Sequence, residues 1–200
     1  LGPLLFIIYV NDLSQHVGIG TCNMYADDLM IYCTGDTPEQ INDNIQNCID
    51  NVSRWYNNNR LIVNTSKSNS MTVATRQRKR QHDNVKLNVS LLESPLDHVS
   101  TSNYLGVRID DCLNWNEHVS KLCSMLASKI SQLRRLRSIT STDILKNICQ
   151  STIQPCFDYA LTIWGNTSNC NLSRVQKLQN YAARIITNNF DYINVRGIDI

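Results

Sequence analysis

Residues 21–34 have the sequence TCNMYADDLMIYCT, in which two apolar runs flank a short acidic segment. The runs Cys22–Tyr25 and Leu29–Tyr32 are rich in residues that favour strands, whereas the intervening Ala26-Asp27-Asp28 is not. The pattern predicts a β-hairpin whose turn carries both aspartates. A hairpin of this size needs a core to pack against, so the segments on either side must supply one.

The adjacent carboxylates of Asp27 and Asp28 are open to two interpretations. Two neighbouring negative charges repel one another, and a divalent cation bound by their oxygens would offset the repulsion. An Asp-Asp pair is also compatible with an ordinary solvated turn, where aspartate is a favoured residue. The pair by itself does not decide between a metal site and a solvated turn.

A helix and several short strands are predicted after the hairpin. Thr37, Pro38 and Gln40 provide an N-cap, a proline at the first helical position and the partner of a capping box. Apolar residues then recur at steps of three and four along one face: Ile41, Ile45, Cys48, Ile49, Val52, Trp55 and Tyr56. Strands are predicted at 61–63, 71–73 and 104–109, with a weaker candidate at 85–89 and a polar, basic loop at 75–84.

From Asn116 onward the pattern becomes helical, so the fold class is predicted to be α+β. Three apolar stripes follow: Val119, Leu122, Leu126, Ile130, Leu133 and Leu136; Ile144, Leu145, Ile148, Cys149 and Ile153; and Leu172, Val175, Leu178, Ala182, Ile185 and Ile186. The change in composition near Trp115 indicates a boundary between two lobes. Trp55, Trp115 and Trp164 are predicted to be core aromatics, since none lies in a basic stretch interleaved with other aromatics.

The first ten residues are strongly apolar and begin without a methionine, so we expect the chain to be cut from a longer polypeptide. Gly2-Pro3 is predicted to initiate a helix, with Leu4, Leu5, Ile8 and Tyr9 as core. The stretch is too short to cross a bilayer and lacks the flanks of a targeting signal, so no membrane partner is expected. The eight cysteines are scattered without metal-ligand spacing and are interpreted as reduced, buried thiols.

The net charge of +2 does not by itself indicate a partner, but the basic residues are clustered. One group is Arg76, Arg78, Lys79 and Arg80, and a second is Arg134, Arg135 and Arg137. Contact with a phosphate backbone is one interpretation of such clusters. The other is a solvated loop or helix end, which is the ordinary fate of a single basic run.

Five ordered segments resemble the reverse transcriptases of non-LTR retrotransposons. The hairpin sequence Tyr25-Ala26-Asp27-Asp28 resembles the catalytic signature of reverse transcriptases. The other four segments occur in the family's order: residues 1–13; Trp55 with Asn59, Leu61, Asn64 and Lys67; residues 104–107 with residues 113–115 and His118; and Tyr159, Trp164-Gly165, Leu178-Gln179 and residues 182–185. The resemblance spans nearly the whole chain.

This resemblance implies an architecture and a reaction. Residues 1–110 would form part of a right-hand polymerase palm, an antiparallel sheet with packed helices, and residues 111–200 an all-helical thumb. The implied reaction is RNA-directed DNA synthesis, in which a primer 3′-hydroxyl attacks an incoming deoxynucleoside triphosphate. RNA template, DNA primer and the triphosphate would be the partners. Two Mg²⁺ ions, with Mn²⁺ as a substitute, would be the cofactors, held by Asp27 and Asp28.

The same resemblance assigns roles to further residues. Lys67 would be a catalytic cation assisting the departure of pyrophosphate, although a solvated lysine is the plain alternative. The residues expected to contact primer, template or nucleotide are Tyr25, Ala26, Tyr104, Leu105, Gly106, Lys177 and Arg184. For Gly106 the alternative is a glycine that merely marks a bulge.

One departure from the family pattern concerns a third aspartate. The family takes it from an upstream strand, so the missing N-terminal part of the same polypeptide is an expected partner, and the 200 residues alone are expected not to polymerise DNA. An intracellular location, in the nucleus or the cytoplasm, is expected from the family's reaction. The alternatives are a non-catalytic nucleic-acid-binding remnant, a helical scaffold over residues 116–189 that docks a partner, and an intron maturase.

Overall fold

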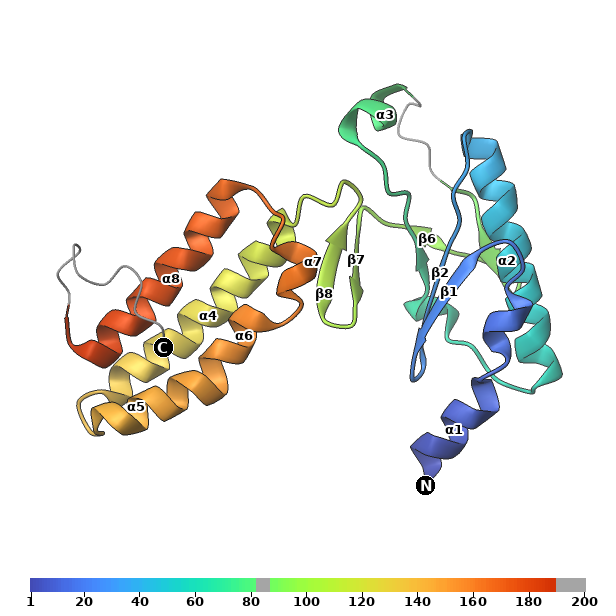
Figure 1. Ribbon diagram of the computed structural model, residues 1–200. Helices are drawn as coiled ribbons and strands as arrows, with labels where there is room; N and C mark the ends of the chain where they lie inside the picture. The colour runs from blue at the N-terminus through green and yellow to red at the C-terminus, as the bar shows by residue number, and fades with distance from the viewer. Residues whose placement is uncertain (82–86, 190–200) are drawn as a thin grey trace. The chain divides into compact units, whose positions relative to one another are not determined.

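A computed structural model describes residues 1–81 and 87–189 of the chain. The chain divides into two compact units, Leu1–Leu113 and Asn114–Ile200. The first unit combines helices with small sheets, and the described part of the second unit is helical (Figure 1). The chain is therefore of the α+β class. Among the described helices, none has both the length and the apolar composition needed to cross a bilayer.

The first unit contains short helical segments, one long helix and several small strands. In chain order these are α1 (Gly2–Val10), η1 (Leu13–His16), β1 (Thr21–Tyr25), β2 (Asp28–Tyr32), α2 (Pro38–Asn58), η2 (Thr65–Lys67), β3 (Asn69–Ser70), α3 (Arg76–Gln81), β4 (Ser90–Leu91), β5 (Ser94–Pro95), β6 (Asp97–His98), β7 (Thr101–Tyr104) and β8 (Val107–Asp110). The pairs β1–β2, β4–β5 and β7–β8 are antiparallel, whereas β3 and β6 pair in parallel. The described strands thus form separate two-stranded sheets rather than one larger antiparallel sheet.

Helix α2 begins where its sequence predicts. Thr37 Oγ1 accepts a hydrogen bond from the Gln40 N–H at 3.2 Å, as an N-cap should. The Gln40 side chain completes the cap one residue further upstream than expected, because its Oε1 accepts from the N–H of Asp36 at 3.0 Å. Both bonds satisfy donors near the start of the helix and fix the exit of the chain from β2.

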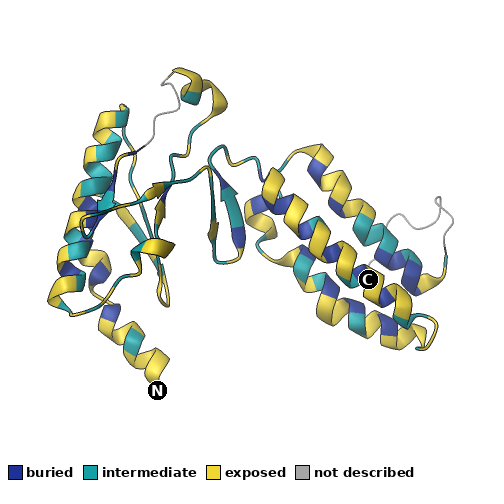
Figure 2. Cartoon of the chain, turned by 180° about the vertical axis from the view of Figure 1, so that it is seen from behind, coloured by how far each residue is buried: buried dark blue, intermediate teal, exposed yellow. Residues whose placement is uncertain are grey.

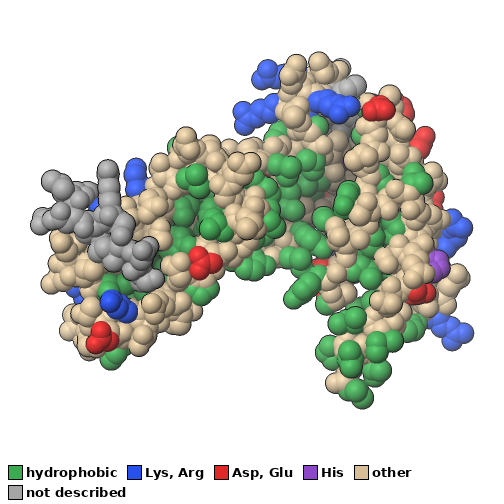
Figure 3. Space-filling view, viewed as in Figure 1, with side chains coloured by type: hydrophobic (Ala, Val, Ile, Leu, Met, Phe, Trp, Pro, Cys, Tyr) green, Lys and Arg blue, Asp and Glu red, His purple; other side chains and the backbone are tan. Residues whose placement is uncertain are grey.

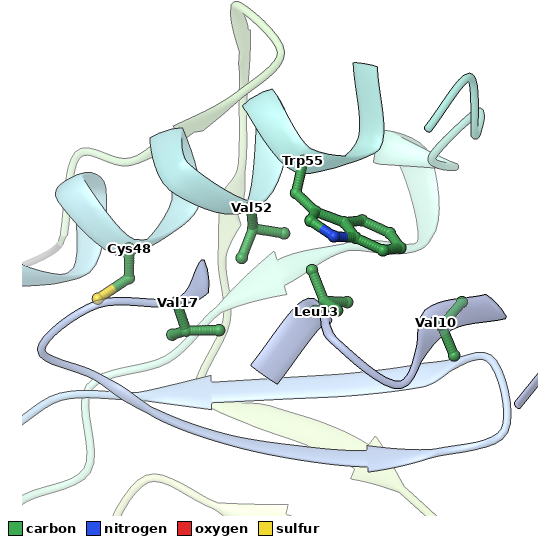
Figure 4. Close-up of a cluster of buried hydrophobic side chains, with 6 residues drawn as sticks. All are labelled: Val10, Leu13, Val17, Cys48, Val52 and Trp55. Atoms are coloured by element: carbon green, nitrogen blue, oxygen red, sulfur yellow. The ribbon is translucent and has the colours of Figure 1, made fainter. Parts of the chain in front are cut away.

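The apolar face of α2 forms the centre of the first unit. Buried side chains gather against it in a cluster made of Val10, Leu13, Val17, Cys48, Val52 and Trp55 (Figure 4). Cys22, Met24, Leu29 and Ile31 of the β1–β2 hairpin pack against this cluster from the inner face of the hairpin. A second cluster on α2 combines Ile49 with Leu87, Val89 and Leu91. The predicted amphipathic helix is confirmed, and it holds the hairpin in place.

Helix α1 forms as predicted after Gly2-Pro3, but the prediction of its core residues is wrong. Leu4, Leu5, Ile8 and Tyr9 are all exposed, and Val10 is the buried residue of the helix (Figure 2). Their apolar side chains gather on the surface at this end of the first unit (Figure 3). The helix is apolar on all sides, so the cluster under α2 can cover only one end of it.

Several predicted strands are also wrong. Residues 61–63 and 71–73 are not strands, and Ile62 is almost fully exposed. Residues 104–109 are not one strand, since the chain turns back at Leu105-Gly106. Part of the predicted loop at 75–84 forms the short helix α3, while residues 82–84 lie outside the described residues. The weak candidate at 85–89 is described only from Leu87, and residues 87–89 there are not strand.

The second unit contains the elements α4 (Asn116–Leu136), α5 (Thr142–Ile148), η3 (Cys149–Ile153), α6 (Gln154–Asp158), α7 (Leu161–Trp164) and α8 (Asn169–Thr187). The predicted stripes form its core, with Leu126, Ile130 and Ile185 among the most buried side chains. Ile144 and Leu172 depart from the prediction and are exposed. The wide π turn of η3 precedes Pro155, which lacks the N–H that an α-helical bond would need.

The three tryptophans are buried, as predicted, in the clusters of their own units. Trp55 is 4% exposed, Trp115 8% and Trp164 1%. The Trp164 ring lies 5.8 Å from the ring of His118, and its Nε1 donates to the Tyr159 carbonyl at 2.8 Å. These side chains therefore serve packing rather than base stacking.

Candidate active site

The acidic turn connects β1 and β2 by two residues. Tyr25 pairs with Asp28 across the hairpin, so Ala26 and Asp27 are the central residues of the turn. Ala26 adopts a left-handed backbone with φ of 53°, which costs an L-residue about 1–2 kcal/mol. Tight hairpin turns require positive φ, and glycine or asparagine ordinarily supplies it. An alanine at this position is therefore a local strain, which Leu105 in the β7–β8 turn and Leu92 and Glu93 in the β4–β5 turn share.

Asp27 and Asp28 are both exposed, but they occupy different positions. Asp27 lies in the turn, whereas Asp28 is the first residue of β2 and not a turn residue as expected. Residues of a strand alternate between faces, and Leu29 and Ile31 face the core. Asp28 therefore lies on the outer face, directly opposite Tyr25, whose side chain is 66% exposed.

The base of the hairpin is more firmly held than its turn. Its inner residues pack on the cluster under α2, and Leu13 and Val17 of that cluster are 2% and 1% exposed. Gly20, just before β1, lies so close to Cys48 and Cys33 that an added Cβ would come within 2.8 Å of the Cys48 Sγ. This close packing fixes the strands that carry the carboxylates, while the carboxylates themselves remain accessible to solvent.

The tight hairpin β7–β8 carries Tyr104 at its turn. Tyr104 ends β7 and pairs with Val107 at the start of β8, and the two turn residues Leu105 and Gly106 have φ of 46° and 79°. Two positive φ values are the pattern of a type I′ turn. The pKa of the Tyr104 hydroxyl is raised, mainly by burial and to a smaller extent by the Asp28 carboxylate and then by Cys22. Tyr104 thus lies within electrostatic range of Asp28.

The sequence does not predict this electrostatic relation. A glycine at the second turn position with apolar residues on both sides is the signal for a hairpin at 104–107, and the prediction of a single strand there misses it. The resemblance alone connects Tyr104, Leu105 and Gly106 to the primer. The structure adds that Tyr104 lies within electrostatic range of Asp28 in the same unit.

Lys67 is exposed at the end of η2, where its N–H donates to the Asn64 carbonyl at 3.2 Å. Among residues 1–81 and 87–189, no hydrogen bond or ion pair joins its side chain to Asp27 or Asp28. Its catalytic role stays a prediction. Lys177 and Arg184 lie on α8 of the second unit, Lys177 exposed and Arg184 half-buried, and their roles stay predictions too.

The acidic pair offers part of a metal-binding shell. Within the described ranges no group of three or more His, Cys, Asp or Glu side chains could hold an ion. Magnesium, however, is commonly bound by one or two carboxylates, with substrate phosphates and water completing its octahedron. Two exposed, adjacent carboxylates on a rigid hairpin fit that donor set as a partial site.

Comparisons with known proteins identify the family of this chain. The reverse transcriptase (RNA-dependent DNA polymerase) family matches residues 1–109, which include the β1–β2 hairpin and all but the last residue of β7–β8. The probable RNA-directed DNA polymerase from transposon X-element of Drosophila melanogaster is 28% identical over 94% of the chain, and the RNA-directed DNA polymerase from mobile element jockey of the same organism is 24% identical over 100% of it. These matches cover 21% and 22% of the relatives, so the chain spans about a fifth of their length.

No solved structure matches the chain significantly. The resemblance seen in the sequence is confirmed by the family match, which covers more than half of the 200 residues, and by the transposon-encoded relatives. The chain therefore belongs to the reverse transcriptase (RNA-dependent DNA polymerase) family.

Proposed function

We propose that the β1–β2 turn is part of the nucleotidyl-transfer site of an RNA-directed DNA polymerase of the non-LTR retrotransposon type. The observation that carries this proposal is the solvent-facing Ala26-Asp27-Asp28 segment on a packed hairpin, inside the residues that the family matches and with Tyr104 within electrostatic range of Asp28. RNA template, DNA primer and deoxynucleoside triphosphates are the proposed partners. The first unit is proposed to be part of a palm, and the second unit a thumb.

Asp27 and Asp28 are the proposed ligands of Mg²⁺, for which Mn²⁺ would substitute. When bound, such ions would lower the pKa of the primer hydroxyl and neutralise charge on the triphosphate. The hairpin's contribution is to hold two carboxylates that repel one another at a fixed position on a packed support. Asp27 is proposed as the principal ligand and Asp28 as its support.

The neighbouring residues are proposed to position the nucleic acid. Tyr25 lies opposite Asp28 on the outer face and would pack beside the primer or template. The tight turn at Leu105-Gly106 would let the backbone of the second hairpin approach the primer. Lys67 would stabilise charge on the departing pyrophosphate, and Lys177 and Arg184 would contact phosphates.

Manganese titration of the 200-residue chain tests the metal site directly. Mn²⁺ is paramagnetic, so it should broaden the amide signals of residues 25–28 before others. The double variant Asp27→Asn/Asp28→Asn should abolish this selective broadening. The matched control Asp43→Asn/Asp50→Asn removes two exposed carboxylates of α2 and should leave it intact. Equal broadening in both double variants would contradict the proposal.

The chain alone is expected to incorporate no deoxynucleotide on a primed RNA template with Mg²⁺. Its described residues supply two carboxylates to this site, and we propose that a third comes from a segment outside the 200 residues. Steady incorporation by the isolated chain would refute this. In a longer polypeptide that does polymerise, Asp27→Asn should lower incorporation about 100-fold or more, because several kcal/mol of charge stabilisation would be lost.

A further inference from the structure

Helix α3 carries a dense positive charge. Its six residues, RQRKRQ, include three exposed arginines, Arg76, Arg78 and Arg80, and no acid. Arg76 and Arg80 are four residues apart and share one face, where like charges repel one another. None of the three arginines forms an ion pair with a residue in 1–81 or 87–189. The described chain therefore offers nothing that offsets their repulsion.

Lys79 differs from these arginines because it fixes the helix to the rest of the unit. Its ammonium forms an ion pair with the Asp111 carboxylate, and the Ala74 N–H donates to the Asp111 carbonyl at 3.1 Å. The start of the helix is closed by Thr75, whose Oγ1 accepts from the Arg78 N–H at 3.3 Å. These two contacts attach α3 to Asp111, the residue that follows β8, and the three arginines remain exposed on the helix.

The position of α3 separates it from the acidic turn. Strand β8 begins at Val107, directly after the turn that follows Tyr104, and Tyr104 lies within electrostatic range of Asp28. Asp111 follows the other end of β8. Four residues of strand span about 13 Å at about 3.3 Å each. Figure 1 shows α3 at the end of β7–β8 opposite to the turn, and Lys and Arg side chains gather there in Figure 3. The helix is thus a separate surface within the first unit.

We propose that Arg76, Arg78 and Arg80 of α3 bind the phosphodiester backbone of a nucleic acid, away from the acidic turn. Guanidinium groups suit this partner because they bind phosphate oxygens in a bidentate manner. The helix contains no aromatic side chain on which a base could stack, so the contacts are to the backbone and independent of base sequence.

The α3 arginines contribute to the affinity for nucleic acid and take no part in the chemical step. Their proposed role rests on the chain's membership of a family of nucleic-acid polymerases, but not on the metal site at Asp27 and Asp28. Binding to it requires neither divalent metal nor nucleotide. The two proposals therefore fail independently of one another.

Binding of the whole chain to a fluorescein-labelled 16-base-pair RNA–DNA hybrid, measured by anisotropy in EDTA between 50 and 200 mM salt, tests the proposal. Arg76→Gln/Arg78→Gln/Arg80→Gln should weaken binding about 10- to 100-fold, and the slope of log affinity against log salt should become shallower by about 2–3. The control Arg60→Gln/Lys121→Gln/Lys146→Gln removes three scattered exposed cations and should weaken binding less than about threefold. Loss in the control equal to that in the α3 variant would mean that only total charge matters and would overturn the proposal.

Two further variants make the result specific. Arg76→Lys/Arg78→Lys/Arg80→Lys keeps the charge and should retain most of the affinity, since lysine also binds phosphate as a point charge. A loss as large as that of the glutamine variant would overturn an electrostatic contact. Asp27→Asn/Asp28→Asn should bind at least as well as the wild-type chain in EDTA, and a severe loss there would place the binding surface at the turn instead. Unchanged far-ultraviolet circular dichroism of each variant confirms that the fold is intact.

Discussion

Two tight hairpins of the first unit, β1–β2 and β7–β8, each have a turn of two residues, but they differ in support and in turn conformation. Hairpin β1–β2 places its inner residues on the buried cluster under α2, whereas β7–β8 lies outside that cluster and contributes Val107 as a buried apolar residue. The β7–β8 turn has Leu105 and Gly106 at φ of 46° and 79°, while the acidic turn has Ala26 at φ of 53°. Each turn therefore holds one L-residue in the left-handed region, and the hairpins differ chiefly in the packing beneath them.

This difference shows where the fold tolerates strain. Glycine adopts positive φ without a steric cost, but an alanine there costs about 1–2 kcal/mol. Packing of the strands beneath the acidic turn offsets that cost. The less embedded hairpin holds Leu105 at positive φ as well, and only its second turn position is an unstrained glycine. Four substitutions would break or sharpen this comparison, beginning with the largest expected effect.

Leu13→Ala should remove the support of the acidic hairpin. The side chain is 2% exposed in the cluster under α2, and truncating such a leucine costs about 2–5 kcal/mol. Native-state hydrogen exchange should show faster exchange in α2 and β1–β2 than in wild type. Ile62→Ala, at a residue that is 99% exposed, is the control and should change protection by less than about 0.5 kcal/mol. Equal effects would mean that the cluster does not support the hairpin.

Gly106→Val should unfold the second hairpin locally. A β-branched residue is an outlier at positive φ, and the cost should be at least about 1–2 kcal/mol. Gly106→Asn tolerates this conformation better and should cost less. The amide protection of residues 101–110 measures both. If valine and asparagine were equivalent, the left-handed backbone at Gly106 would not be what matters.

Ala26→Gly should stabilise the acidic hairpin while weakening its function. Relief of about 1–2 kcal/mol of backbone strain outweighs the extra conformational entropy that glycine loses on folding, about 0.5–1 kcal/mol, so a net gain of up to about 1.5 kcal/mol is expected. The more flexible turn should hold its carboxylates less well, and half-maximal Mn²⁺ broadening should need more metal. A variant that is more stable and binds Mn²⁺ equally well would show that the strain has no role in the site.

Asp28→Asn should lower the pKa of Tyr104, and this is the smallest of the four effects. The pKa should stay above its ordinary value because burial is the larger cause. A raised tyrosine pKa means that the folded state holds its proton longer, so the associated stability is complete below pH 10 and is lost as pH rises through the folded pKa. Titration of the ¹³Cζ signal of Tyr104 measures the change. Asp27→Asn should shift it less, and equal shifts would contradict the proximity of Tyr104 to Asp28.

Local patterns allowed much of the first hairpin and the long helices to be predicted. The strands beside Asp27 and Asp28, the capped start of α2 and the buried stripes of α4 and α8 are confirmed, because each depends on residues close together in the chain. Short apolar runs did not predict strands correctly where no strand of the described chain pairs with them. Residues 61–63 and 71–73 have strand composition, but a strand forms only when another strand satisfies its backbone.

The sequence by itself determined the family, the acidic hairpin and the periodic faces of the helices, since these depend on residue identity and spacing. Only the tertiary structure decided that Tyr104 lies within electrostatic range of Asp28, that α1 exposes its apolar residues, and that Lys79 pairs with Asp111 and leaves three arginines exposed. The physical reason is that such contacts join residues far apart in the chain. They form only where packing of the intervening segments compensates for the entropy of closing long loops.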